Sequence, residues 1–311
     1  MTVMVTGGNG FIGQRIVRIL LERGEEVVSF DIAPPRSGSL NESDKYSFYR
    51  GDITQIPHLT EAINANSVDR IIHMAALLPP DTEDRPHFGM LVNIQGTNNV
   101  FEVARWTGVQ RVVYASSISV YGTQEPFGDR LINEDDHHEP VNVYGMTKSA
   151  NDFSAAAYRQ RFGLDLRGVR ICTVFGHGRV TGMTGMIGGL LASLPAIGEP
   201  IDLPFHPDEA SSMIHAEDAA EIFVRITLAD NLNYPVYISG GHLCSVADMA
   251  DQVRTIIPDA KITTGDQRVP HVYLVDNSRM LTDIGYELAP LRLRIKEHIN
   301  DARREAGMPS V

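Results

Sequence analysis

The stretch Thr6-Gly-Gly-Asn-Gly-Phe-Ile-Gly13 decides the fold. It places Gly7, Gly10 and Gly13 at three-residue spacing, after a short apolar strand over residues 1–7 and before a run of helical periodicity. A dinucleotide pyrophosphate needs a tight turn, a backbone without Cβ and a helix N-terminus, and the three glycines can meet these needs in order. The flanking strand and helix favour this interpretation over a glycine-rich turn without a ligand.

The rest of the N-terminal half alternates between strands and helices. Apolar residues recur at helical spacing from Ile12 to Arg23, and Gly24 ends this helix before an apolar strand at 26–30. Further strands are expected at 46–49, 70–73, 111–116 and 166–171, with helices at 57–65, 88–107 and 144–162. Such alternation is typical of an α/β fold in which helices cover both faces of a doubly wound parallel sheet, as in the Rossmann fold.

The composition changes after Phe175. Six glycines lie between Gly176 and Gly189, which predicts a mobile segment. Beyond it we expect short helices at 216–229, 246–257 and 291–305, and short strands at 236–238 and 261–263. These elements predict an NAD-binding Rossmann domain over residues 1–172, rejoined by later segments, and a mainly substrate-binding α/β subdomain over 173–311.

Asp31 ends the second strand, at the distance from the glycines where an acidic side chain can accept hydrogen bonds from the adenosine ribose. Its carboxylate would repel a 2′-phosphate, so NAD is favoured over NADP, although Arg36 lies nearby in the sequence. Phe11 and Ile12, inside the glycine turn, are expected to contact the same cofactor.

Tyr144 and Lys148 are four residues apart in an expected helix and therefore share one face of it. A nearby ammonium stabilises a phenolate, so this pair can act as an acid and base. Ser117 ends the strand at 111–116, at the sheet edge where ligands bind in open α/β folds. We expect Ser117 to hold the substrate oxygen that Tyr144 protonates or deprotonates.

Composition narrows the function classes. The chain of 311 residues has 39 Asp and Glu against 27 Lys and Arg, and its net charge of −12 would repel nucleic acid. Two cysteines, Cys172 and Cys244, suit a reducing compartment. No secretory signal or membrane-spanning run is evident, which predicts a cytoplasmic protein that binds neither nucleic acid nor membrane.

Several motifs, in one order along nearly the whole chain, resemble the extended short-chain dehydrogenases/reductases of the NAD-dependent epimerase/dehydratase type. They are the glycine turn, Gly51-Asp-Ile53, His73-Met-Ala-Ala76, Asn93-Ile-Gln-Gly-Thr97, Ser116 to Gly122, Tyr144 to Lys148 and His215 to Ala219. The resemblance implies that Asp52 and Ile53 flank the adenine and that Ala75 and Asn93 line the cofactor cleft. It also implies a Ser117, Tyr144 and Lys148 catalytic trio, in which Lys148 orients the cofactor ribose, and a homodimer paired through two helices of each subunit.

The departures from the family pattern bear on the substrate. Family members that act on nucleotide sugars carry an Asn and an Arg that contact the diphosphate, where this chain has Thr173 and Ser211. Loss of the guanidinium removes a strong contact with phosphate. Dehydratases of the family have an Asp-Glu pair where this chain has Ile118-Ser119, so elimination of water is not expected.

These features favour a dehydrogenase of carbohydrate metabolism that acts on a secondary alcohol or ketone of a small sugar-like or sugar-acid substrate without a nucleotide. Thr173, His177 and Arg179 are candidate substrate contacts. The alternatives are a nucleotide-sugar 4-epimerase and a non-catalytic NAD-binding sensor. We expect no metal, because the adjacent His137 and His138 would seldom converge on one ion.

Overall fold

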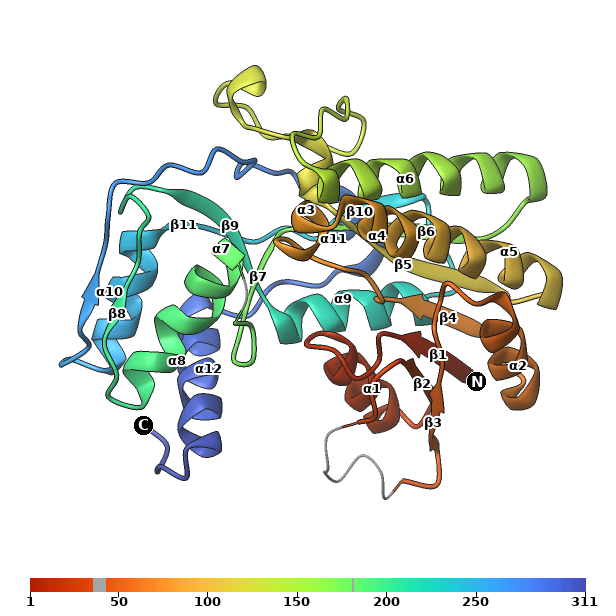
Figure 1. Ribbon diagram of the computed structural model, residues 1–311, viewed down its shortest axis with the longest axis horizontal. Helices are drawn as coiled ribbons and strands as arrows, with labels where there is room; N and C mark the ends of the chain where they lie inside the picture. The colour runs from red at the N-terminus through yellow and green to blue at the C-terminus, as the bar shows by residue number, and fades with distance from the viewer. Residues whose placement is uncertain (36–42, 181) are drawn as a thin grey trace.

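The computed structural model describes residues 1–35, 43–180 and 182–311. At its centre a 7-stranded parallel sheet has the order β10-β6-β5-β4-β1-β2-β3 (Figure 1). The strands are β1 (Thr2–Thr6), β2 (Glu26–Asp31), β3 (Tyr46–Arg50), β4 (Arg70–His73), β5 (Arg111–Ser117), β6 (Leu166–Ile171) and β10 (Val236–Ile238). The order reverses between β1 and β4, so the predicted doubly wound fold is confirmed, and a crevice is expected at the carboxyl ends of these two strands.

Helices cover both faces of this sheet (Figure 1). One face carries α2 (Ile56–Asn66), α5 (Thr97–Thr107) and α6 (Val143–Phe162), and the other carries α1 (Gly13–Glu22), α9 (Ala216–Leu228) and α11 (Ser278–Ile284). Each face has its own cluster of buried apolar side chains. No helix within the described residues combines the length and apolar character that a membrane span requires.

Two predicted segments take a different form from the expected one. The single helix expected at 88–107 consists of α4 (Pro86–Met90), a π-helical section η2 (Leu91–Gly96) and α5, and the short helix α3 (Asp81–Asp84) precedes them. After β5 the chain forms the 3₁₀ turns η3 (Ile118–Tyr121) and η4 (Glu125–Phe127). A hydrophobic pattern cannot distinguish these helix types in segments this short, because one or two turns are too few to separate their periods.

The C-terminal half builds a smaller α/β unit with its own apolar cluster. A 3-stranded mixed sheet has the order β11-β9-β7, and β8 pairs with β12 beside it. The strands are β7 (Thr173–Phe175), β8 (Ile201–Asp202), β9 (Ala210–His215), β11 (His242–Ser245) and β12 (Ile262–Thr263). The helical segments are α7 (Gly182–Gly185), η5 (Met186–Leu190), α8 (Leu191–Ala196), α10 (Val246–Ile256) and α12 (Leu291–Glu305). Sequence reasoning missed β7, β9 and β11 and the helical segments between Gly182 and Ala196.

The glycine-rich segment, for which we expected mobility, packs closely against its own helical turns. A Cβ on Gly189 would lie 1.7 Å from the carbonyl oxygen of Arg179, and one on Gly188 would lie 2.7 Å from that of Val174. The amide of Gly176 donates a hydrogen bond to the carbonyl of Gly188 (2.8 Å). These glycines allow two stretches of backbone to touch, which holds the loop that contains Arg179.

Candidate active site

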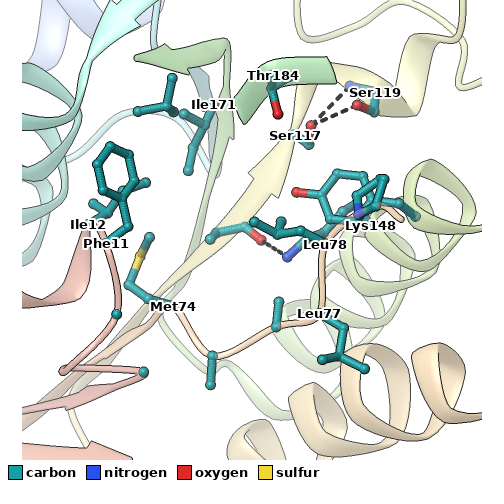
Figure 2. A pocket seen from close by; sticks show the side chains of 18 of the residues that line it. Phe11, Ile12, Met74, Leu77, Leu78, Ser117, Ser119, Lys148, Ile171 and Thr184 are labelled. Atoms are coloured by element: carbon teal, nitrogen blue, oxygen red, sulfur yellow. Dashed lines mark hydrogen bonds between the residues drawn. The ribbon is translucent and has the colours of Figure 1, made fainter. Parts of the chain in front are cut away.

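A cavity of about 710 Å³ lies at the carboxyl ends of the central strands. Figure 2 shows Phe11, Ile12 and Met74 on one side of it, opposite Ser117, Ser119 and Lys148. Most residues that the sequence proposes for cofactor, catalysis and substrate line this cavity: Gly7, Gly10, Phe11, Ile12, Gly13, Asp31, Asp52, Ile53, Ala75, Ser117, Tyr144, Lys148, Thr173 and Arg179. The fold therefore brings side chains and turns from both halves of the chain to one place.

The glycine turn joins β1 to α1 at one end of the cavity. Gly7 has a φ of +67°, and the amide of Gly10 donates to its carbonyl at 3.0 Å. A Cβ on Gly13 would lie 2.0 Å from the same oxygen, so no other residue fits there without moving the turn. At the start of α1 no side chain caps the helix. The amides of Gln14 and Arg15 donate to backbone carbonyls, whereas the Gly13 amide has no acceptor among the described residues and can bind an anion.

Asp31 is held at the end of β2 by backbone donors. Its carboxylate oxygens accept hydrogen bonds from the amides of Asn9 (3.0 Å) and Ala33 (3.1 Å). The side chain is half-buried and lines the cavity, so the carboxylate can accept further bonds from a ligand. Arg36, which we considered beside Asp31, lies outside the described residues.

Ser117, Tyr144 and Lys148 come from the end of β5 and the first turns of α6. The Ser117 hydroxyl donates to Ser119 Oγ at 3.1 Å and accepts from the Ser119 amide at 3.1 Å. Lys148 is almost fully buried and donates from Nζ to the Ala115 carbonyl at 2.7 Å. Its Nζ is 5.6 Å from the centre of the Tyr144 ring, which confirms that the two side chains share one face of the helix.

The electrostatics of Tyr144 differ from our expectation. Burial raises the pKa of its phenol above the ordinary value, and Arg179 is the charged group that opposes this rise most, followed by the Ser117 hydroxyl. Burial lowers the pKa of Lys148 from 10.5 to about 8, with Asp152 opposing that shift. We expected Lys148 to lower the phenol pKa, but here the cation that acts on Tyr144 is Arg179.

Two of the proposed residues do not line the cavity. Asn93 is fully buried beneath it, where its amide accepts from the Leu77 amide (2.8 Å) and donates to the Leu77 carbonyl (3.0 Å). It thus supports the loop after β4, and Leu77 itself lines the cavity. The ring nitrogens of His177 contact Ser193 Oγ (3.1 Å) and the carboxylate of Glu305, toward α8 and α12.

Sequence reasoning missed Glu83, which anchors the catalytic helix. One carboxylate oxygen of Glu83 accepts from the Val143 amide and the other from the Tyr144 amide, both at 3.0 Å. Asn142 caps the same turn, accepting from the Gly145 amide at 2.7 Å. Glu83 belongs to α3, about sixty positions earlier in the chain, so no local pattern could indicate this contact.

Thr184 and His271 were missed as well, and both line the cavity. Thr184 Oγ1 accepts hydrogen bonds from Arg179. His271 Nε2 lies 2.7 Å from the hydroxyl of Ser211, which occupies the position of the diphosphate-binding Arg in the family pattern. A neutral serine that pairs with a wall residue thus replaces a cation there.

Lys148 should make stability depend on pH. The pKa of Lys148 is about 8 in the folded protein and 10.5 as its ordinary value. Between these two pH values the unfolded chain binds more protons than the folded one, so the contribution of Lys148 to the free energy of unfolding rises with pH. Below about pH 8 the folded state bears the full cost of the buried ammonium. Lys148→Met should therefore gain stability relative to wild type at pH 7, and the gain should shrink by pH 10. Urea unfolding without added dinucleotide measures both differences.

The control for this measurement is Lys296→Met, on the exposed surface of α12. Its stability difference from wild type should be the same at both pH values. A pH-independent difference for Lys148→Met would show that the buried amine does not titrate in this window.

Removal of the Glu83 carboxylate should loosen the first turn of α6. Because two amides of that turn lose their acceptors, Glu83→Ala should lower the turnover number about tenfold while the Kd for NADH changes little. Asp81→Ala is the control, since the Asp81 carboxylate on the same short helix pairs with Arg85 at the surface. Unchanged turnover in Glu83→Ala, measured with any secondary-alcohol substrate of the protein, would contradict this role.

The chain is similar to known proteins in both sequence and structure. The model of the NAD dependent epimerase/dehydratase family matches residues 3–237. A UDP-glucose 4-epimerase of Mycolicibacterium smegmatis is 31% identical over 72% of this chain and 72% of its own length. A D-erythronate dehydrogenase of Cupriavidus necator is 28% identical over 56% of this chain and 55% of its own length. The structure of the Thermus thermophilus UDP-glucose 4-epimerase in complex with NAD has a TM-score of 0.85 and 22% identity, covering 97% of this chain and 99% of that one.

Other curated relatives are matched over less of their own length. The chain spans 57%, 56% and 42% of the length of three of them. The family match nevertheless includes the glycine turn, Asp31, Ser117, Tyr144 and Lys148, the residues that meet around the cavity. The resemblance noted from the sequence motifs is thereby confirmed, and the chain belongs to the NAD-dependent epimerase/dehydratase family.

Proposed function

We propose that this protein is an NAD-dependent dehydrogenase that interconverts a secondary alcohol and a ketone on a small sugar-like or sugar-acid substrate without a nucleotide. The single observation that supports this best is the continuity of one cavity from the glycine turn and Asp31 to Ser117, Tyr144 and Lys148. Such a cavity can hold a dinucleotide along its length and a small substrate at the catalytic end.

The residues present fit NAD. The turn offers a backbone without side chains and the amide at the start of α1 for the pyrophosphate, and Asp31 offers a carboxylate for the adenosine ribose. Asp52, Ile53 and Ala75 line the cavity where the family places the adenine and the cleft wall. Tyr144 and Lys148 would hold the nicotinamide ribose. When bound, NAD supplies the acceptor for the hydride.

The catalytic step then rests on this chain's own side chains. Ser117 donates a hydrogen bond to the substrate oxygen, and Tyr144 Oη removes the hydroxyl proton while the carbinol C–H bond breaks with its electron pair leaving as hydride. The carbinol carbon becomes a ketone. Arg179 favours the phenolate electrostatically, since it opposes the rise in the pKa of Tyr144. In the reverse direction the same phenol returns the proton.

The substrate end favours a molecule without a nucleotide. Ser211, where the family pattern has a diphosphate-binding Arg, is engaged by His271, and Thr173 replaces the corresponding Asn. A relative in Cupriavidus necator is a D-erythronate dehydrogenase, and erythronate is a sugar acid that has no nucleotide. Among the proposed substrates, both observations favour a sugar acid.

A nucleotide-sugar 4-epimerase is the second candidate, favoured by the similarity to the Mycolicibacterium smegmatis enzyme over 72% of both chains. It would use the same trio but return the hydride to the substrate. Cofactor stays bound through such a cycle, so no reduced NAD accumulates.

The decisive assay follows NADH absorbance with purified protein freed of bound nucleotide, across sugar acids, polyols and UDP-sugars. We expect NADH from a nucleotide-free alcohol, and a loss of at least about a hundredfold in turnover for Tyr144→Phe with little change in the Kd for NAD. Tyr158→Phe, on the same helix but outside the cavity, is the control. Interconversion of UDP-glucose and UDP-galactose without net NADH would replace the proposal with the epimerase, and full function of Tyr144→Phe would indicate a sensor.

We also propose a cytoplasmic homodimer that pairs through α5 and α6. Their outer surface exposes Trp106 (53%), Phe162 (49%) and Phe153 (78%), large apolar side chains that a partner subunit would cover. Phe153→Asp should shift the sedimentation coefficient from dimer to monomer at micromolar concentration. Leu243→Asp, at a side chain that is also exposed (57%) but lies on β11, should leave the dimer intact. A monomeric wild-type protein would contradict the proposal.

A further inference from the structure

Arg179 lies in a closely packed loop beside the cavity. Its carbonyl oxygen would lie 1.7 Å from a Cβ on Gly189, and its neighbour Val180 touches Gly185 in the same way, with its carbonyl carbon 2.6 Å from a Cβ there. The backbone on both sides of the side chain is therefore packed against helical turns. The guanidinium reaches into the cavity, which it lines together with Tyr144, Ser117 and Thr184.

Thr184 fixes the orientation of the guanidinium. Its Oγ1 accepts hydrogen bonds from Nε (3.2 Å) and Nη2 (2.6 Å) of Arg179. A guanidinium has more donors than these two bonds use, and the N–H groups of Nη1 and the second hydrogen of Nη2 are left over. The remaining edge is the paired, planar one that matches the two oxygens of a carboxylate.

The charge of Arg179 has no carboxylate partner in the part of the chain that the structure describes. Tyr144 is the group whose charge favours its protonated form. Burial lowers the pKa of the guanidinium. Because charges that are removed from solvent in proteins are normally paired, a half-buried cation that lines a cavity and forms no ion pair with the described residues points to an anionic group on the ligand.

We propose that Arg179 binds a substrate carboxylate in a bidentate manner, and that the substrate is a short hydroxy acid whose reacting hydroxyl is on the first or second carbon from the carboxylate. This inference rests on the proposed function and narrows it. Arg179 lines the same cavity as Tyr144, Ser117 and Thr184, so one small substrate can place its carboxylate on Arg179 and its reacting hydroxyl on Tyr144. The effect of Arg179 on the phenol, the strongest of any charged group, agrees with this arrangement.

A diphosphate is the other anion that a guanidinium could bind. The cavity offers a diphosphate little positive charge beyond Arg179. Among the described lining residues Lys148 is the other cation, and its ammonium donates to the Ala115 carbonyl. The remaining wall at this end is largely apolar or neutral, with Ile171, Thr173 and Met183. A single oriented guanidinium matches one carboxylate, whereas the two phosphates of a diphosphate need more positive charge.

The test compares 2-hydroxy and 3-hydroxy acids of three to six carbons with polyols of the same length, in steady-state NADH production. Arg179→Gln keeps an amide but removes the positive charge and the paired N–H donors. It should lower kcat for acids and polyols alike, because the Tyr144 phenolate loses its nearby cation, and it should raise KM at least about tenfold for the acids alone. Arg179→Lys should recover only part of the loss, because an ammonium cannot bond bidentately. Thr184→Val should give an intermediate rise in KM.

Val180→Ala is the matched control, since Val180 is adjacent in sequence but exposed and outside the cavity. It should behave as wild type. An equal rise in KM for acids and polyols in Arg179→Gln, or an unchanged KM for acids, would overturn the carboxylate assignment.

A binding measurement separates this inference from the proposed function. Oxamate, a small carboxylate, is titrated into the protein–NADH complex and followed by NADH fluorescence, and UDP is titrated by calorimetry. We expect oxamate binding that Arg179→Gln weakens at least about tenfold, even where no substrate turns over. UDP binding that depends on Arg179, without oxamate binding, would assign the guanidinium to a diphosphate and overturn the inference.

Discussion

The close approach of the Gly13 Cα to the Gly7 carbonyl is the constraint on which the site depends. A Cβ at position 13 would lie 2.0 Å from that oxygen, so β1 and α1 can be joined this tightly only by glycine. The tight junction leaves the start of α1 uncapped at the mouth of the crevice between β1 and β4. Every other element of the site is arranged along the cavity that begins at this junction.

The catalytic end depends on contacts between segments that are far apart in the chain. Glu83 holds the first turn of α6, Lys148 reaches back to the Ala115 carbonyl at the end of β5, and Arg179 comes from the loop after β7. Burial shifts the pKa values of Tyr144 and Lys148 in opposite directions. It disfavours the charged phenolate of Tyr144 and the charged ammonium of Lys148, so the phenol pKa rises and the amine pKa falls, each in favour of the neutral form.

The C-terminal half places Arg179 beside the cavity and has neutral residues, Thr173 and Ser211, where the family resemblance implies nucleotide contacts. Three glycines, at 185, 188 and 189, let the loop of Arg179 lie against helical turns. Ser211 is bonded to His271 instead of presenting a charge to the cavity. These features agree with the proposed substrate without a nucleotide, and the residues of the proposed NAD site lie within the stretch that the family model matches.

The sequence alone determined the strand and helix alternation, the glycine turn, Asp31 and the shared helix face of Tyr144 and Lys148. These features depend on residue spacing within one or two neighbouring elements, where periodicity and turn chemistry act directly. The strands β9 and β11 escaped prediction because they pair with each other antiparallel across about thirty residues, outside the regular alternation of strand and helix. Glu83, Thr184 and the pairing of Ser211 with His271 were decided only by tertiary structure, since their partners are brought within hydrogen-bonding distance by folding. The effect of Arg179 on the pKa of Tyr144 could not be predicted from the sequence either. The electrostatic interaction between two groups depends on their burial and on the distance between them, and both are set by the fold.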